Sequence, residues 1–370
     1  MSRKEGTAIG PWLFWSIMII SNFSYGQINA TRYECQTMGA NGYLAVLIAA
    51  LATLPVLVII YLLMKRFPGQ NLIQQGIWIM GNQLGRAIGL VYLLFVLALF
   101  AVYSRDTINI IQTYLLEYTP SNFLNAVTLL TAAYLGSRGI ETVSRLASFV
   151  ILPFLLVLLL VVITVISEIS VDRLLPLFHL EFNFRGPGGL TILNIFYPMG
   201  LLALITPYLK GIHAKLPRLT LLALTILISV SMLYSIGTIG VFGHEYLLSL
   251  AYPNLEAVRL IELPYLLLEQ IGLFWIVLLF SNVLISSGYF LYLLGLGLSQ
   301  ACGILDYKRF IWILTPIVFI LMLLIRNETE TKLLAAGFAR YGWICLFGYP
   351  CFLYLLALIF RKKGNQADVS

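Results

Sequence analysis

The chain has 370 residues, of which 60% are hydrophobic and only 11% are charged, and its mean hydropathy is +0.92. A water-soluble core could not enclose so large an apolar fraction, so the composition excludes a soluble globular protein and indicates one that spans a lipid bilayer. The formal net charge is +7. We attribute this charge to orientation in the membrane and expect no nucleic-acid partner.

Apolar stretches long enough to cross a bilayer follow one another along the whole chain. At roughly 20 residues per span and with short connections, they predict about ten helices and a single transmembrane domain over residues 1–370. The fold class is therefore an all-α, multi-pass membrane protein. The stretches are Pro11 to about Ala30, Tyr43–Met64, Ala87–Ile111, Asn122–Gly136, Leu146–Ile166, Leu190–Leu209, Leu219–Phe242, Leu266–Leu298, Phe310–Ile325 and Tyr341–Phe360.

Basic residues gather in alternate connections between these stretches. Lys65 and Arg66 follow the second stretch, and Arg361–Lys363 follow the tenth. Cytoplasmic loops carry an excess of lysine and arginine, so this pattern predicts that both termini lie in the cytoplasm.

Two stretches are interrupted at matching positions. The first contains the polar run Ser21–Gln27, and the sixth contains Pro198 and Gly200 two residues apart. Polar groups and helix breakers at that depth are typical of discontinuous helices that line a site. Each interruption opens a five-helix half, at approximately 11–168 and 190–360, and the two halves have opposite topology. This arrangement predicts a small-molecule site at mid-bilayer, between broken spans one and six.

The predicted ligand contacts come from four spans. The first break would supply backbone and polar contacts, the sixth an apolar end, and spans three and eight would complete the site. The same residues have an ordinary interpretation in membrane helices, as close packing, a proline kink or interhelical hydrogen bonds. The candidates are Asn22, Ser24, Tyr25 and Gly26; Phe196, Tyr197, Pro198, Met199 and Gly200; Phe95 and Leu99; and Ser281, Asn282, Ser286 and Ser287.

Other polar residues predict structure more than chemistry. Arg105 and Asp106, near the outer end of span three, would snorkel or pair at the interface, or else act as a gate. Glu141 and Arg145 have the favourable i,i+4 order of a helical ion pair. We identify no acid isolated at mid-membrane, no nucleophile with a base and no metal-ligand spacing, so we expect no enzyme activity, no metal and no cofactor.

A long outer connection, residues 243–265, mixes acidic residues with leucine and tyrosine. This composition predicts an amphipathic helical cap over the outer mouth, which would either seal the site or face a partner.

Several motifs, in order, resemble the B subunits of bacterial spore germinant receptors, the GerAB-type family of the amino acid-polyamine-organocation superfamily. They extend over essentially the whole chain. The motifs are the broken run Ser21–Gly26, the basic Pro-Gly turn Lys65–Leu72, the glycine-punctuated segment Gly81–Gly89, Tyr103-Ser104-Arg105, Leu115 to Pro120 with its Thr-Pro turn, and Arg138–Leu146 with its Gly-x-Glu.

The resemblance implies a LeuT-like fold, with five plus five helices and with helices one and six broken. It also implies residence in the spore inner membrane, beside an A-type membrane subunit and a C-type lipoprotein. The function it implies is sensing of a small nutrient germinant, typically an amino acid, a nucleoside or a sugar and in the first place an amino acid, which triggers germination. The alternative is an amino acid secondary transporter of the same superfamily, because a fold by itself does not fix function.

Overall fold

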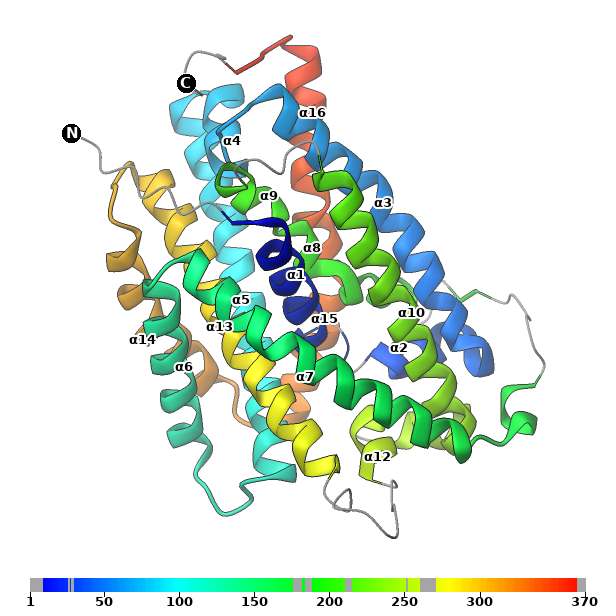
Figure 1. Ribbon diagram of the computed structural model, residues 1–370. Coiled ribbons are helices and arrows are strands. Elements are labelled where there is room, and N and C mark those ends of the chain that lie inside the picture. The colour runs from blue at the N-terminus through cyan, green and yellow to red at the C-terminus, as the bar shows by residue number, and fades with distance from the viewer. Residues whose placement is uncertain are drawn as a thin grey trace.

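The protein is described by a computed structural model over residues 9–25, 27, 30–175, 182–183, 188–209, 215–250, 252–259 and 271–364. Its regular structure in these ranges is entirely helical. The helices form a bundle with α1 (Pro11–Tyr25) at its centre, where it packs against helices of both halves of the chain (Figure 1). The prediction of an all-α membrane protein is confirmed.

The first half of the chain contains the interrupted first span and four long helices. The short helix α4 lies before α5. This short helix begins with a capping box, in which the Asn71 side chain accepts a hydrogen bond from the backbone amide of Gln74. The elements after α1 are α2 (Ala30–Met38), a 3₁₀ turn η1 (Gly39–Asn41), α3 (Gly42–Arg66), α4 (Leu72–Met80), α5 (Asn82–Tyr114), α6 (Ser121–Ser137) and α7 (Ile140–Ser167).

The second half begins with an irregular span and ends with a span made of two consecutive helices. Its elements are η2 (Val171–Leu174), η3 (Leu190–Phe196), α8 (Tyr197–Gly200), α9 (Leu202–Ile205), η4 (Thr206–Tyr208), α10 (Leu216–Phe242), α11 (His244–Ser249), α12 (Pro253–Arg259), α13 (Ile271–Cys302), α14 (Tyr307–Leu324), α15 (Glu328–Leu346) and α16 (Gly348–Ile359).

Among the described residues, eight helical segments are long and apolar enough to cross a bilayer. The helices α1 and α6, of 15 and 17 residues, are shorter than these but pack within the same bundle. Together they account for the ten predicted spans.

Two predicted boundaries are wrong for the same reason. Helical structure resumes beyond the first break and continues to Met38, although the sequence predicts an end near Ala30. The last span begins at Glu328, well before the predicted Tyr341. Both missed segments carry charged residues, which lower local hydropathy and hide a helix from a pattern based on apolar runs.

The sixth span is irregular where its sequence predicts a break. A 3₁₀ segment, η3, leads into two single helical turns, α8 and α9, with Pro198 in the first of them. The 3₁₀ geometry forms weaker hydrogen bonds than the α-helix and is uncommon over a long run. The predicted interruption is therefore present, although it takes the form of a poorly wound span.

Close approach of α6 and α13 depends on glycine. A Cβ atom built on Gly136 would lie 2.7 Å from the carbonyl oxygen of Gly288, closer than a real carbon contact allows. Small residues at such crossings let helix backbones pack tightly in membranes.

We expect Gly136→Ala to lower the melting temperature of the purified protein, because overpacking of this kind costs about 1–3 kcal/mol. Gly337→Ala is the matched control, since a Cβ atom there meets nothing within 4 Å. Differential scanning fluorimetry in detergent measures both variants. Equal melting temperatures for the two would contradict the tight crossing.

Candidate functional site

The interruption of the first span carries buried polar side chains. Ser21, Asn22 and Ser24 are all fully buried. Each donates a hydrogen bond to a carbonyl oxygen of its own helix, as in Asn22 Nδ2 to Met18 O at 2.7 Å and Ser24 Oγ to Ile20 O at 2.8 Å. Such bonds compete with the backbone ladder and favour the end of a helix. Gly26 and the side chain of Tyr25 lie outside the described part of the chain.

The eighth span meets this interruption directly. Ser286 on α13 donates to Ser24 on α1, with 2.7 Å between the two hydroxyl oxygens. Ser287 is also fully buried, whereas Ser281 is partly exposed and donates to a carbonyl oxygen of its own helix. The predicted meeting of spans one and eight is therefore present, and it is made through Ser24 and Ser286.

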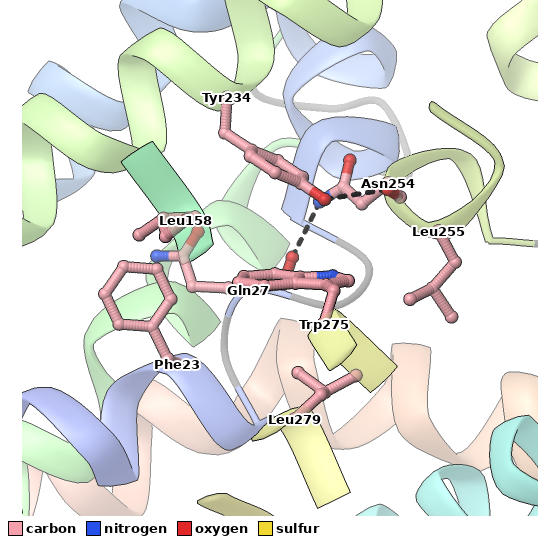
Figure 2. A pocket seen from close by; sticks show the side chains of 8 residues that line it. All are labelled: Phe23, Gln27, Leu158, Tyr234, Asn254, Leu255, Trp275 and Leu279. Atoms are coloured by element: carbon pink, nitrogen blue, oxygen red, sulfur yellow. Dashed lines mark hydrogen bonds between the residues drawn. The ribbon is translucent and has the colours of Figure 1, made fainter. Parts of the chain in front are cut away.

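A cavity of about 30 Å³ lies beside this part of the first span. Figure 2 shows its wall, in which Phe23 and Gln27 of the first span face Tyr234 of α10 and Trp275 of α13. Because a single water needs about 10–15 Å³ on this measure, the cavity as it stands admits little more than water. Its lining residues, here called the chamber, are Phe23, Gln27, Leu158, Tyr234, Asn254, Leu255, Trp275 and Leu279.

Gln27 connects the interrupted span to α10 and α12. Its side-chain Nε2 donates to Ser231 Oγ at 2.7 Å, and its backbone oxygen accepts from Asn254 Nδ2 at 2.8 Å. The hydroxyl of Tyr234 donates to the Asn254 carbonyl at 2.7 Å, as Figure 2 shows. Polar backbone at a helix break inside a membrane needs partners of this kind.

The predicted outer cap contains two helices, α11 and α12, while residues 251 and 260–265 of that connection lie outside the described ranges. Here "the cap" means residues 244–250 and 252–259. Arg32 of α2 donates to the carbonyl oxygens of Leu248 and Leu250. Two tyrosines also connect the cap to α5: Tyr252 donates to Asp106 at 3.2 Å, and Tyr114 donates to Glu256 at 2.5 Å.

Tyr252 is the central residue of that cap contact. Burial, together with the nearby carboxylate of Asp106, raises the pKa of Tyr252, so its hydroxyl stays protonated and remains a donor. The ammonium of Lys332 lies 4.8 Å from the centre of its ring.

The two charged residues predicted at the interface are both buried. Asp106 is 6% exposed and Arg105 is 8% exposed, so neither snorkels. Asp106 accepts from the cap through Tyr252, whereas Nε and Nη1 of Arg105 have no hydrogen-bond partner among the described residues. The predicted Glu141–Arg145 ion pair is confirmed at 2.6 Å.

Several predicted ligand-contact residues of spans three and six contact α15 or its junction with α16. Tyr197 donates to the carbonyl oxygen of Ala339 on α15, and a Cβ atom on Gly200 would press against Phe347. Phe95 packs on Phe338, with ring centres 5.4 Å apart. These three residues therefore contact α15 and its junction with α16.

The remaining members of that predicted set are buried close to the centre of the bundle. The helix α8 packs directly on α1, so the sixth span does reach the first. Leu99 of α5 lies in the buried interior. The buried members are Leu99, Phe196, Pro198 and Met199.

Several polar residues of this region are absent from the sequence-based candidates. Gln27 and Asn254 line the chamber, and the hydroxyl of Tyr103 on α5 donates to Asn194 of the sixth span. Glu34 is fully buried on α2 and accepts a hydrogen bond from Ser235. Glu34 is therefore a buried acid that the sequence-based candidates did not include. The residue was missed because the first span was ended too early, at Ala30.

Comparison with known proteins places this architecture. The chain matches 23% of positions over 341 residues of Spore germination protein YndE of Bacillus subtilis (strain 168), covering 90% of each chain. Spore germination protein A2 of the same organism is 23% identical over 98% of this chain and 99% of its own length, and Spore germination protein B2 is 19% identical over 94% and 95%.

Solved structures share the fold. A manganese transporter of Eremococcus coleocola, in complex with an aromatic bis-isothiourea compound, superposes with a TM-score of 0.55 at 14% identity and covers 100% of this chain and 87% of its own. A mutant form of the Eremococcus coleocola manganese transporter gives 0.50 at 14% identity, over 97% and 81%. The fold is thus that of LeuT-like transporters. Residues 9–331 match the family model described as Spore germination protein, and the chain belongs to the spore germination permease family.

Proposed function

We propose that this chain is the membrane subunit of a spore germinant receptor. In this proposal it binds a small nutrient, in the first place an amino acid, beside the break in its first span. Family membership over residues 9–331 supports the germination role. The observation that carries the site is the chamber at Phe23 and Gln27, where the interrupted span, the three helices α7, α10 and α13, and the cap meet.

The size of the chamber supports a receptor that changes conformation. At about 30 Å³ it is far smaller than the roughly 300–1,000 Å³ of ordinary ligand pockets, so a nutrient must enlarge it. Enlargement must move at least one wall, and the cap is the smallest of them. A ligand biases such an equilibrium only by its differential affinity for the two states. In this proposal the cap rises when the nutrient binds.

The partners and location follow the family. We assign the chain to a complex with an A-type membrane subunit and a C-type lipoprotein in the spore inner membrane. The names of two relatives, Spore germination protein A2 and Spore germination protein B2, are in keeping with a multi-subunit setting. The basic connections support cytoplasmic termini.

An amino acid transporter is the second candidate, because the solved structures that share this fold are transporters. The two functions differ in their need for partners. A transporter moves substrate by itself, whereas a receptor subunit acts only in its complex. Germination of spores that carry the chain with and without its A-type and C-type partners separates the two, and germination without either partner would remove the receptor proposal.

The contact between Ser24 and Ser286 gives a direct test of the site. We expect Ser286→Val to reduce the germination response by at least about tenfold, because it leaves Ser24 without its cross-helix partner at the edge of the break. The decrease in absorbance of a spore suspension measures this response.

Thr131→Val is the matched control, since Thr131 is exposed on α6 and donates to a carbonyl oxygen of its own helix. Immunoblotting of spore membranes verifies equal amounts of both variants. A normal response from Ser286→Val at normal abundance would remove this contact from the site.

The cap gives a second test. Tyr114→Phe removes the hydrogen bond from the Tyr114 hydroxyl to the Glu256 carboxylate without altering the chamber. Hydrogen bonds to charged groups contribute about 1.5–3 kcal/mol. We therefore expect amide hydrogen exchange over residues 252–259 to become about tenfold faster, since each 1.4 kcal/mol corresponds to roughly that factor.

Tyr246→Phe is the control for that exchange measurement, because Tyr246 is exposed on α11. It should leave exchange over the same residues unchanged. Equal exchange in Tyr114→Phe and the unmodified protein would show that the cap is held by other contacts.

A further inference from the structure

The amide of Asn282 is the least satisfied polar group next to the candidate site. Its side chain is fully buried within α13. Neither its oxygen nor its nitrogen has a hydrogen-bond partner in the described part of the chain. An amide with both groups buried and unpaired is rare in a native structure, and each such group calls for an explanation.

Helical spacing places Asn282 on the face of α13 that meets the first span. Trp275 and Leu279 line the chamber, and Ser286 bonds to Ser24 of α1. Leu279, Ser286 and Trp275 lie three, four and seven residues from Asn282 along the chain. These intervals put all four residues on one side of a helix. Asn282 therefore lies between the chamber and the contact of Ser286 with the broken span.

Two more unpaired polar atoms lie in the chamber wall. The indole Nε1 of Trp275 is a buried donor without an acceptor, and Oδ1 of Asn254 is a buried acceptor without a donor, as far as the described residues extend. Figure 2 shows both side chains in the wall. Asn282, Trp275 and Asn254 together offer two donors and two acceptors. The donors are the amide nitrogen of Asn282 and the indole nitrogen of Trp275, and the acceptors are the amide oxygens of Asn282 and Asn254.

The described wall of the chamber carries no charged side chain. Among the described residues that line it, none is acidic or basic, and three are aromatic. An ion with a net charge would lose its hydration there without gaining a counter-charge, which is strongly unfavourable. A neutral molecule meets no such penalty, because its donors and acceptors match those of the wall. A zwitterion carries a charge of each sign, so each of its charged groups keeps a counter-charge within the same molecule.

We propose that Asn282 is a specificity-determining residue of this site and that the site takes small ligands of zero net charge, either neutral or zwitterionic. Nδ2 of Asn282 donates to a ligand oxygen, and Oδ1 accepts from a ligand N–H or O–H. Trp275 donates to a second ligand oxygen, and the aromatic wall packs on the apolar body. This inference rests on the proposed function, because it names the class of nutrient for the same site.

The test is equilibrium binding of radiolabelled probes to the purified protein in lipid nanodiscs. The probes of zero net charge are L-alanine, L-valine, L-asparagine, inosine and D-glucose, and the charged probes are L-lysine and L-glutamate. We expect saturable binding of at least one uncharged probe and none of the charged ones. Asn282→Leu, close in shape but without polar atoms, should weaken that binding at least tenfold.

Ser281→Ala is the matched control, because Ser281 is the partly exposed neighbour of Asn282 on the same helix. It should bind the probe like the unmodified protein. Melting temperature separates binding from folding: Asn282→Leu removes two unpaired polar atoms and should melt no lower than the unmodified protein. Asn282→Thr, which is smaller and still polar, is measured in the same assay, and we expect its affinity for the probe to fall at least threefold.

Each contrary result has a different meaning. Equal binding in Asn282→Leu, Asn282→Thr and the unmodified protein would overturn the role of Asn282 while leaving the receptor proposal intact. Binding of L-lysine or L-glutamate as tight as that of every uncharged probe would overturn the charge rule. Binding of no probe at all to the unmodified protein would overturn the proposed function, and this inference with it.

Discussion

Polar groups inside a bilayer must find their partners within the protein, and the interrupted first span makes this requirement acute. A lipid environment supplies no hydrogen bonds to a helix that stops halfway. Here Gln27 and Ser24 at the interruption find partners on three other elements: Gln27 bonds to Ser231 of α10 and Asn254 of α12, and Ser24 bonds to Ser286 of α13. The break therefore fixes which helices surround α1.

The same requirement connects the break to the cap. Asn254 is part of α12, next to Tyr252, which bonds to α5, and its carbonyl accepts from Tyr234 of α10. Movement of the cap exposes the Gln27 carbonyl unless another group replaces Asn254. A bound nutrient that offers such a group would compensate for the loss. This exchange of partners is the physical basis on which a ligand could favour a second conformation.

Hydropathy and polar interruptions in the sequence predict the number of spans, the two irregular spans and the contact of the eighth span with the first. They do so because a lipid-facing helix tolerates few polar residues. They do not predict how each helix is rotated about its axis. Tyr197, Gly200 and Phe95 were candidates by depth, but they face α15 and its junction with α16. Rotation is set by packing with helices distant in sequence, which an apolar run does not encode.

Boundaries fail where charge enters a membrane helix. Glu34 lies on α2, beyond the point at which hydropathy falls, and its carboxylate is paired with Ser235 of α10. The chamber residues Gln27 and Asn254 were missed for a related reason, since one follows the break and the other belongs to an outer connection. A site assembled from a span, a break and a loop has no single sequence pattern.

The most direct test of this account is uptake and binding of labelled amino acids, nucleosides and sugars by the purified protein in liposomes, with and without an imposed ion gradient. The account predicts saturable binding that does not lead to accumulation, whatever the gradient. Concentrative uptake by the protein alone would contradict it and would make the chain a transporter.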